Sequence, residues 1–286
     1  MPTFTNQAIL TLKGVSYASN IITGEIINVL TVDKNAIENE YASGGRITYV
    51  VSLRNSGPSP LNNLTLSDNL GGYSFSGDTL VPLDADINSI AYYINGQLQP
   101  TGSLDVSAGP PMTIGGIDVP AGGNAQIIYQ TTANSLAPLA SATGITNIVT
   151  VTGEQLQTPV TDMETVVAGQ SPVISITKAL SPTTVPENGQ ITYTFQILNA
   201  GNTPVVATDD MILTDVFNPR LSNLTAVYNG TFWTEGIQYT YNEMTGEFVT
   251  LPGAISVPAA TFEQNPVTGE WIVTPGSSEL EVSGTV

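Results

Sequence analysis

Short runs in which apolar and polar residues alternate make up most of this chain. Such runs occur at Leu30 to Lys34, at Leu64 to Asp68 and at Ile174 to Lys178, with residues typical of turns between them. Alternation with a period of two is typical of β-strands that bury one face. Apolar stretches with a helical period are few. The pattern therefore predicts an all-β fold built from sandwiches of short strands.

The strand pattern repeats once along the chain at a fixed spacing. The repeated features are Lys34, Ile47–Tyr49 and Asn55–Gly57 in the first copy, and Lys178, Ile191–Tyr193 and Asn199–Gly201 in the second. The two lysines are 144 residues apart, and the other pairs keep that spacing. A match of this length indicates a duplicated structural repeat. We expect both Asn-x-Gly sequences to form turns, because Asn and Gly tolerate a positive φ.

This order of features resembles a bacterial and archaeal surface-repeat family called domain of unknown function eleven. Its pattern is a strand with a lysine, a Thr-Tyr strand ending in Asn-x-Gly, and a strand ending in Asp, here Asp68 and Asp215. The resemblance covers nearly the whole chain, twice, from about Leu30 onward. It implies two immunoglobulin-like β-sandwiches in a cell-surface protein with a structural role. It implies no particular ligand or reaction.

The two copies differ where they end. The first copy continues past Tyr129 into a closing hairpin made by residues 145–151 and 161–167. The second copy stops at Val286, which corresponds to about Thr132 of the first. The expected organisation is a hairpin segment at residues 1–30, a complete domain at 31–170, and a second domain at 171–286 that lacks its closing hairpin.

The N-terminal segment resembles the hairpin that the second copy lacks. Thr5-Asn6 and the alternating residues after it match Thr146-Asn147 and its strand, and Lys13-Gly14 is a turn candidate. A sandwich without its last strands exposes an apolar groove and unpaired backbone groups, which an added strand can fill. The residues expected to enter the groove are Ala8, Leu10, Leu12, Ile22 and Ile26. Burying such a set is worth on the order of 10 kcal/mol before ordering costs are subtracted.

Two assemblies are compatible with this deficit. In the first, the hairpin of one chain completes the second domain of the next, which gives a head-to-tail filament that need not close. In the alternative, the hairpin folds back onto its own chain and leaves a monomeric surface adhesin or ligand-binding module. We favour the filament, because the first copy lies between the two segments and already has its own closing hairpin.

Three polar residues of the first copy end apolar rows that should face the core. Counting by two along each strand places Lys34, Asp68 and Asn147 on these inner faces. Burying an amine, a carboxyl and an amide costs free energy unless they satisfy one another. The unreactive alternative is a buried Lys–Asp ion pair with the Asn hydrogen-bonded nearby.

The reactive alternative is a spontaneous isopeptide bond, which resembles the chemistry of Gram-positive pilin and collagen-adhesin domains. Burial favours the neutral amine, which attacks the Asn side-chain carbonyl while the Asp shuttles protons and ammonia leaves. In the first copy the set is Lys34, Asp68 and Asn147. In the second copy it is Lys178 and Asp215, with Asn6 supplied by the neighbouring subunit.

Composition narrows the possible functions further. The chain has 24 acidic against 6 basic residues, so nucleic acid and anionic membranes are not expected partners. It contains no Cys and no His, which removes disulfides, thiolate zinc sites and histidine acid–base chemistry. We therefore expect no enzyme beyond bond formation within the assembly, no cofactor and no metal. The expected partner is the protein itself.

The sequence also bears on location. The first residues have neither a basic region nor a long apolar run, so we expect no secretory signal in this chain and no membrane insertion. A mature form, or assembly without ordinary secretion, would fit this observation. We expect the protein outside the cell, or on the surface of a cell or spore.

Overall fold

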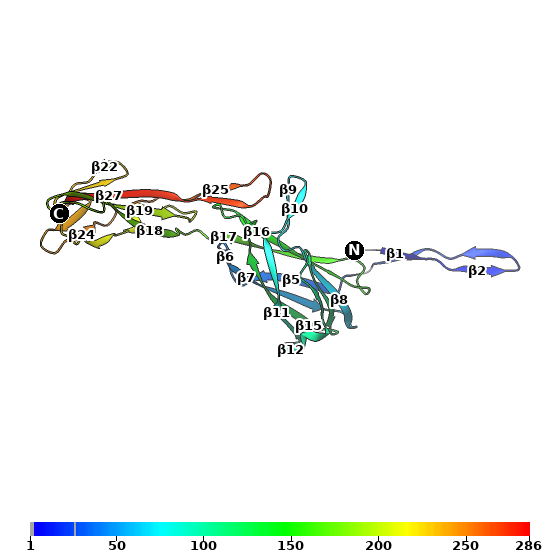
Figure 1. Cartoon of the computed structure of the whole chain (residues 1–286). Helices are drawn as coiled ribbons and strands as arrows, with labels where there is room; N and C mark the ends of the chain where they lie inside the picture. Colours follow the sequence, from blue (N-terminus) through cyan, green and yellow to red (C-terminus); the bar gives the residue numbers. More distant parts are fainter. Residues whose placement is uncertain (1–2, 26) are drawn as a thin grey trace. The chain divides into compact units, whose positions relative to one another are not determined.

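The structure is a computed structural model that describes residues 3–25 and 27–286. Its elements are β-strands, apart from two short 3₁₀ helices at Thr101–Ser103 and Ala207–Asp209. The chain divides into two compact units (Figure 1). Unit 1 comprises Met1–Pro138 and Gly144–Val167, and unit 2 comprises Leu139–Thr143 and Ala168–Val286. The prediction of an all-β fold with two immunoglobulin-like sandwiches and an N-terminal hairpin is confirmed.

Unit 1 has two large sheets. The five-stranded sheet has the order β12-β11-β15-β7-β5 and the six-stranded sheet the order β13-β14-β8-β16-β17-β6. The first sheet consists of β5 (Leu30–Ala36), β7 (Arg46–Asn55), β11 (Leu83–Ile94), β12 (Gln97–Gln99) and β15 (Asn124–Ala133). The second consists of β6 (Glu40–Tyr41), β8 (Leu61–Asp68), β13 (Asp105–Ser107), β14 (Met112–Val119), β16 (Gly144–Thr152) and β17 (Val160–Ala168). A small hairpin, β9 (Tyr73–Phe75) with β10 (Asp78–Leu80), is attached.

Unit 2 repeats the first sheet but only part of the second. Its five-stranded sheet has the order β18-β19-β27-β21-β22, and its second sheet has three strands in the order β20-β24-β23. The strands are β18 (Ile174–Ser181), β19 (Gln190–Asn199), β20 (Thr214–Val216), β21 (Ser222–Tyr228), β22 (Thr231–Phe232), β23 (Tyr239–Asn242), β24 (Glu247–Thr250) and β27 (Gly276–Thr285). A separate hairpin joins β25 (Thr261–Gln264) to β26 (Trp271–Thr274).

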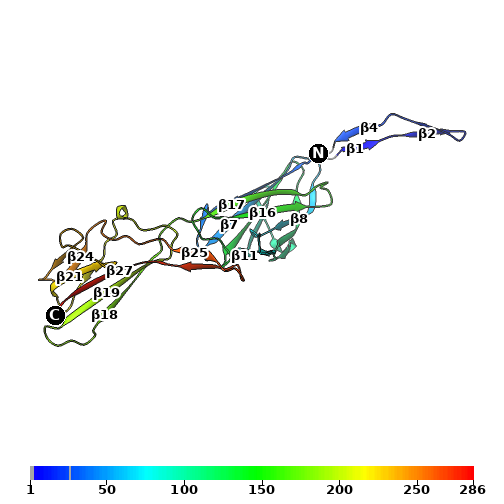
Figure 2. The ribbon, with the colours of Figure 1, turned by 90° about the horizontal axis from the view of Figure 1, so that it is seen from above.

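The pairing registers of the two units correspond. Lys34 lies opposite Val51 on β5 and β7, and Lys178 lies opposite Phe195 on β18 and β19. In each unit the strand that pairs with the lysine strand, β7 or β19, pairs on its other side with a ten-residue strand, β15 or β27. In unit 1, β8 lies between β14 and β16 in the six-stranded sheet, and Figure 2 labels β8 beside β16. In unit 2, β20 pairs with β24 alone among the described residues.

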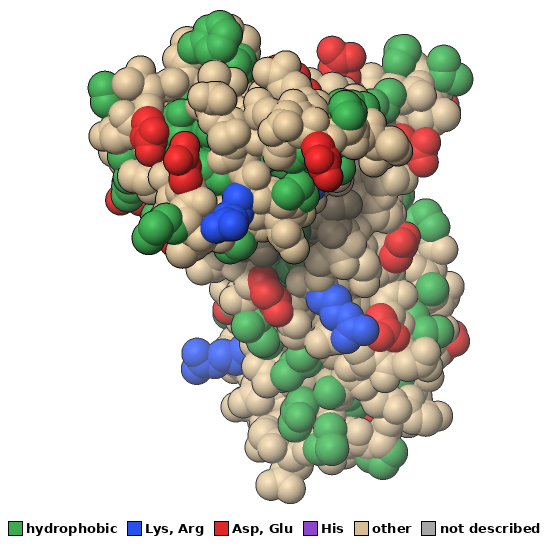
Figure 3. Space-filling view, turned by 60° about the vertical axis from the view of Figure 1, so that its left-hand side comes forward, with side chains coloured by type: hydrophobic (Ala, Val, Ile, Leu, Met, Phe, Trp, Pro, Cys, Tyr) green, Lys and Arg blue, Asp and Glu red, His purple; other side chains and the backbone are tan. Residues whose placement is uncertain are grey.

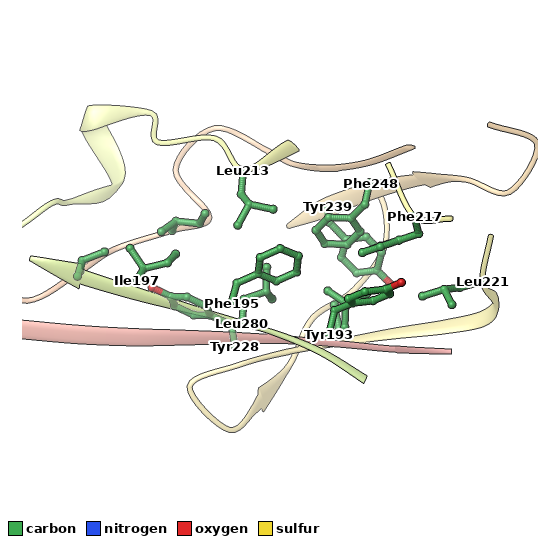
Figure 4. Close-up of a cluster of buried hydrophobic side chains, with 14 of the residues drawn as sticks. Tyr193, Phe195, Ile197, Leu213, Phe217, Leu221, Tyr228, Tyr239, Phe248 and Leu280 are labelled. Carbon is green, nitrogen blue, oxygen red and sulfur yellow. The ribbon is translucent and has the colours of Figure 1, made fainter. Parts of the chain in front are cut away.

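The core of unit 2 explains why this smaller sandwich still packs. Aromatic side chains from both sheets point toward one another between the layers (Figure 4). Tyr193 stacks on Phe217, with ring centroids 4.7 Å apart, and Tyr239 stacks on Phe248 at 5.1 Å. The Tyr239–Phe248 pair lies within one sheet, whereas Tyr193 and Phe217 meet across the two layers. Because each aromatic ring buries a large apolar area, this shared cluster holds the smaller sandwich together.

Both Asn-x-Gly sequences are turns, but the reason we gave for them is wrong. Neither Asn55 nor Asn199 has a positive φ, and neither do the glycines that follow them. Both asparagines are instead fully buried, and their side-chain oxygens accept the backbone N–H of Gly57 and Gly201 at 2.9 Å. The Asn amide therefore fixes the turn through hydrogen bonds rather than through its backbone conformation.

The N-terminal segment folds as a long, twisted hairpin. It consists of β1 (Thr3–Asn6), β2 (Ile9–Leu12), β3 (Val15–Ala18) and β4 (Ile22–Glu25), and β1 pairs with β4 while β2 pairs with β3. The turn lies at Lys13–Gly14, both with positive φ, where the sequence predicts it. The structure contains, within its described residues, no helix with the length and hydropathy needed to cross a bilayer.

Candidate assembly and cross-linking site

Lys34 lies in the centre of unit 1, between the two sheets. Its side chain is 0% exposed and donates a hydrogen bond to Asp68 on β8. Its Nζ also lies 3.1 Å from the hydroxyl of Tyr129 and 4.5 Å from the ring centre of Tyr49. Strands β7 and β15 thus place two tyrosine rings, and β8 places one carboxylate, around the amine of Lys34.

The Asp68 carboxylate accepts most of the hydrogen bonds in this cluster. One carboxylate oxygen accepts hydrogen bonds from Lys34 and from the Tyr129 hydroxyl, and the other accepts the backbone N–H of Leu70 at 2.8 Å. Its side chain is 0% exposed. Three donors on a buried carboxyl fix its orientation, which a proton-shuttling group requires.

Asn147 on β16 lies on the same buried side of unit 1. It is fully buried, two residues along β16 from Val149, which lies directly opposite Asp68. Its side-chain oxygen accepts the backbone N–H of Gly71 at 3.2 Å, while its amide nitrogen has no hydrogen-bond partner in the described part of the chain. A backbone donor on the carbonyl oxygen makes the amide carbon more electrophilic. An amide nitrogen without a partner is unusual in a core and is the group that a cross-link would release.

The electrostatics of the cluster follow from its burial. Burial lowers the pKa of Lys34 below its ordinary value, and the neighbouring Asp68 carboxylate opposes that shift. Burial also raises the pKa of Tyr129 and of Tyr49, and the nearby Asp68 charge adds to both shifts. A lowered lysine pKa makes the uncharged amine, which is the nucleophilic form, more accessible near neutral pH.

The closing hairpin β16–β17 is what seals this cluster from water. β16 pairs with β8 next to Asp68, and β17 adds a carboxylate, because Asp162 accepts the backbone N–H of Lys34 at 2.7 Å. The hairpin therefore covers both the acid strand β8 and the outer edge of the lysine strand β5.

Unit 2 holds the same lysine and acid in a different environment. Lys178 donates a hydrogen bond to Asp215 and lies over the Tyr193 ring, 4.4 Å from its centre. The side chains of Lys178 and Asp215 are 39% and 20% exposed, whereas those of Lys34 and Asp68 are 0%. The position of Tyr129 is taken by Val282, which lies opposite Tyr193 as Tyr129 lies opposite Tyr49.

The exposure of the unit 2 pair reflects an open groove. A cavity of about 390 Å³, open to solvent and walled mostly by apolar side chains, lies between residues of β18 and the segment that leads into β20. The wall is formed by Ile174, Ile176, Ile197, Met211, Ile212, Leu213, Thr214 and Ile255. All eight residues of β18 are exposed, whereas β5 buries Leu30 and Lys34. Unit 2 thus has a groove where unit 1 has β16.

The residues expected to fill such a groove lie on the surface of the N-terminal hairpin. Leu10 and Leu12 are 70% and 61% exposed, Ile22 is 57% exposed, and Ala8 is also exposed. Ile26 lies outside the described residues. Asn6 is exposed and lies opposite Ile22 on β4. The hairpin strands pair with one another only, so the structure does not bring Asn6 together with Lys178 or Asp215.

Three residues of the unit 1 cluster, Tyr129, Tyr49 and Asp162, are not among those predicted from the sequence. The strand alternation places Tyr129 and Tyr49 on inner faces of paired strands. The Tyr129 hydroxyl bonds Asp68, whereas the Tyr49 hydroxyl has no hydrogen-bond partner in the described part of the chain. The hydrogen bond that the backbone N–H of Lys34 donates to the Asp162 carboxylate joins two different sheets. Counting along a strand gives the face of a residue but not such a contact across the sandwich.

The surface of the chain carries the acidic character of its sequence. On the face drawn in Figure 3, acidic side chains are spread widely and basic ones are few. Apolar side chains also reach the surface there. Among the described residues no group of three or more acidic side chains is arranged to hold a metal ion.

Comparisons with known proteins give little beyond distant structural likeness. No family model matches the chain and no curated protein does. The resemblance to domain of unknown function eleven therefore rests on the repeated residues alone.

The solved structures that are similar include three pilus proteins. BcpA, the major pilin subunit of Bacillus cereus, is 11% identical over 96% of this chain and 73% of that chain, with a TM-score of 0.36. The major pilin GBS80 of Streptococcus agalactiae, a 35 kDa C-terminal fragment, is 9% identical over 87% and 91%, also with a TM-score of 0.36. The pilus backbone RrgB of Streptococcus pneumoniae is 10% identical over 86% and 55%, with a TM-score of 0.34.

Proposed function

We propose that this chain is the structural subunit of an extracellular or spore-surface filament. The N-terminal hairpin of one subunit supplies the strands that unit 2 of the next subunit lacks. Repetition of this contact gives a head-to-tail polymer, because the donor and the acceptor are different surfaces of the chain and the contact need not close on itself.

The observation that carries this proposal is that β20 is hydrogen-bonded to a neighbouring strand along one of its two edges. The equivalent strand β8 has neighbours on both sides, β14 and β16, whereas β20 pairs only with β24 in the part of the chain that the structure describes. An unpaired strand edge beside an apolar groove is an unstable surface in water and is typical of sites that accept an added strand.

The hairpin has the complementary properties. Leu10 and Leu12 lie on one face of β2, and their partners on β3, Tyr17 and Val15, share that face. These side chains are 53–70% exposed, so the hairpin leaves a continuous apolar face uncovered. Apolar faces of this kind are typical of protein interfaces. Burying them in the groove of unit 2 would remove two exposed apolar surfaces at once.

We also propose that the unit 1 cluster forms an isopeptide bond. The uncharged Lys34 amine attacks the side-chain carbonyl carbon of Asn147, and Asp68 passes a proton from the amine to the departing nitrogen. One C–N bond forms, one breaks, and ammonia leaves, so no oxidant or cofactor is required. The support is the burial of all three residues together with the unpartnered amide nitrogen of Asn147.

The same chemistry would lock the filament. Docking places Asn6 of the incoming hairpin at the position that Asn147 holds in unit 1, beside Lys178 and Asp215. In the free subunit that pair is partly exposed, and the arriving hairpin would bury it. The bond between subunits would therefore form after docking and not before it, because burial is what favours the uncharged amine.

The second candidate is a monomeric adhesin or ligand-binding module whose hairpin completes unit 2 of its own chain. The groove supports this alternative equally, because it accepts a hairpin from either source. The aromatic residues of unit 2 do not favour an adhesive role, since Tyr239 lies in the core and Trp233 packs against it.

The test compares the full chain with a chain that lacks residues 1–25, which removes the hairpin up to the end of β4 and leaves β5 intact. Both proteins are purified and imaged by negative-stain electron microscopy at equal concentration. We expect fibres from the full chain only. Monomers from both proteins would contradict the filament and favour the adhesin.

A further inference from the structure

Unit 1 contains a template for the docked hairpin, because its own closing strand is visible. Val149 and Val151 of β16 lie opposite Asp68 and Leu66 of β8. Matching Asn6 to Asn147 and Asp215 to Asp68 sets Ala8 opposite Asp215 and Leu10 opposite Leu213. The apolar side chains of the hairpin then enter the groove, and the polar ones face outward.

The same register can be followed to the tip of the hairpin. In unit 1 the ladder ends at Thr152 opposite Thr65, and Gly153 lies against Leu64. Continuing the count by one more residue brings Glu154 to the position of Asn63. By the same steps, Lys13 at the tip of the docked hairpin falls at the position of Asp210. The backbones agree as well, because Asn63 and Asp210 are both left-handed, with φ of 54° and 50°.

The charges at these two positions differ between the units. Unit 1 has an acidic tip residue, Glu154, beside the neutral pair Asn62 and Asn63. The donor hairpin has a basic tip residue, Lys13, and would meet the acidic pair Asp209 and Asp210. Glu154, Lys13 and both aspartates are exposed, so none of these charges is committed to a core.

We infer that Lys13 and the Asp209–Asp210 pair form a charge contact that fixes the register of the docked hairpin and selects it as the occupant of the groove. This inference rests on the proposed filament and names the residues that give its contact specificity. Three features converge on it: the apolar groove, the register set by β16, and opposite charges at the position which that register brings together.

The contact also explains how the wrong hairpin is excluded. Two hairpins of this chain match such a groove: the N-terminal one, and β16–β17, which would first have to leave β8 of its own unit. The second carries Glu154 at its tip, which the two aspartates would repel. A like-charge contact of this kind discriminates between partners more than it adds affinity.

The test measures filament elongation from seeds by light scattering, with full-length subunits at low and at high ionic strength. We expect Lys13→Glu to slow elongation about tenfold at low salt, and 1 M salt to remove most of the difference. Adding Asp210→Lys to Lys13→Glu should restore elongation, because the pair is then reversed.

Two controls separate charge from damage to the hairpin. Lys13→Asn removes the charge and keeps the turn, because an Asn-Gly sequence suits the positive φ values there. This variant should slow elongation less than Lys13→Glu does. Asp78→Asn removes an exposed acid on β10 and should have no effect.

The outcomes distinguish this inference from the function on which it rests. If wild-type filaments grow, Leu10→Asp stops them, and Lys13→Glu grows at the wild-type rate in low salt, the charge contact is overturned while the filament stands. The charge contact is also overturned if high salt does not restore the elongation rate of Lys13→Glu. The same holds if adding Asp210→Lys does not restore it. If wild-type subunits form no filament, the proposed function itself fails.

Discussion

Lys34 and Lys178 occupy matched places in the two units, yet only the first is closed to water. The difference lies in the neighbouring strand and not in the lysine, since both donate to an aspartate and both lie over a tyrosine ring. The chemical state of each lysine is thus set by what covers it. Two predictions follow at this scale.

The first prediction concerns the mass of the purified protein. We expect the intact chain to be lighter than its sequence by one ammonia, and Lys34→Ala and Asn147→Ala each to restore the full mass. Asn147→Ala should also lower the free energy of unfolding by about 4 kcal/mol, since a cross-link that closes a loop of roughly 100 residues stabilises by that order. Asn134→Ala is the control, because that partly buried Asn lies outside the cluster. A full mass for the wild type would leave the unreactive ion pair as the correct interpretation.

The second prediction concerns pH in the Asn147→Ala variant, where Lys34 stays a free amine. Its folded pKa lies below the ordinary value of 10.5, so between the two values the unfolded chain binds more protons. The free energy of unfolding should therefore rise with pH in that window, up to about pH 10, where tyrosine ionisation begins to act in the opposite direction. Urea titrations at pH 7 and pH 9.5 measure the slope. Adding Lys34→Met should abolish it, and an unchanged slope would refute the assignment to Lys34.

At the scale of elements, the hairpins decide the difference between the units. β16 and β17 give unit 1 a sealed core, while β20 in unit 2 keeps only three ladder residues. The sequence predicts a longer strand from Met211, but without a partner on its outer edge the ladder shortens to Thr214–Val216. At Leu213 a side chain takes the place of a backbone acceptor, because the Thr250 hydroxyl accepts the backbone N–H of Leu213 at 2.8 Å.

The third prediction tests which face of the hairpin is buried on docking. Leu10→Asp places a carboxylate in the groove and should weaken association at least 100-fold, because burying an unpaired charge costs several kcal/mol. Ile9→Asp is the matched control: it adds the same carboxylate to the same strand, on the face that matches Thr150 of β16 and points outward. Sedimentation velocity of the two variants gives the comparison. Equal loss of assembly from both would contradict the proposed face.

Much of the unit 1 cluster could be predicted from sequence alone. Counting by two placed Lys34, Asp68 and Asn147 on inner faces, and all three are buried. The count works because the side-chain period of a strand is two. It fails where the ladder is irregular: between the pairs Ile9–Ala18 and Asn6–Ile22 the return strand has one extra residue, so its facing residues change.

At the scale of the whole molecule, the N-terminal hairpin exposes apolar side chains, and strand β20 of unit 2 has one unpaired edge within the described residues. Exposed apolar residues on the hairpin and an apolar groove in unit 2 are each unfavourable in water, and each is the kind of surface that the other would cover. The strong negative charge, 24 acidic against 6 basic residues, would keep subunits apart except where charges complement each other. Assembly would then depend on the specific contact between hairpin and groove rather than on nonspecific hydrophobic association.

The most direct measurement uses the absence of cysteine in the sequence. Ile9→Cys and Thr214→Cys, in an Asn6→Ala background that prevents the cross-link between subunits, place the chain's only two thiols at positions that pair on the outer face of the docked strand. After mild oxidation, the account predicts a ladder of disulfide-linked multimers on a denaturing gel that reductant collapses to monomer. A monomer carrying an internal disulfide, or no disulfide at all, would contradict it.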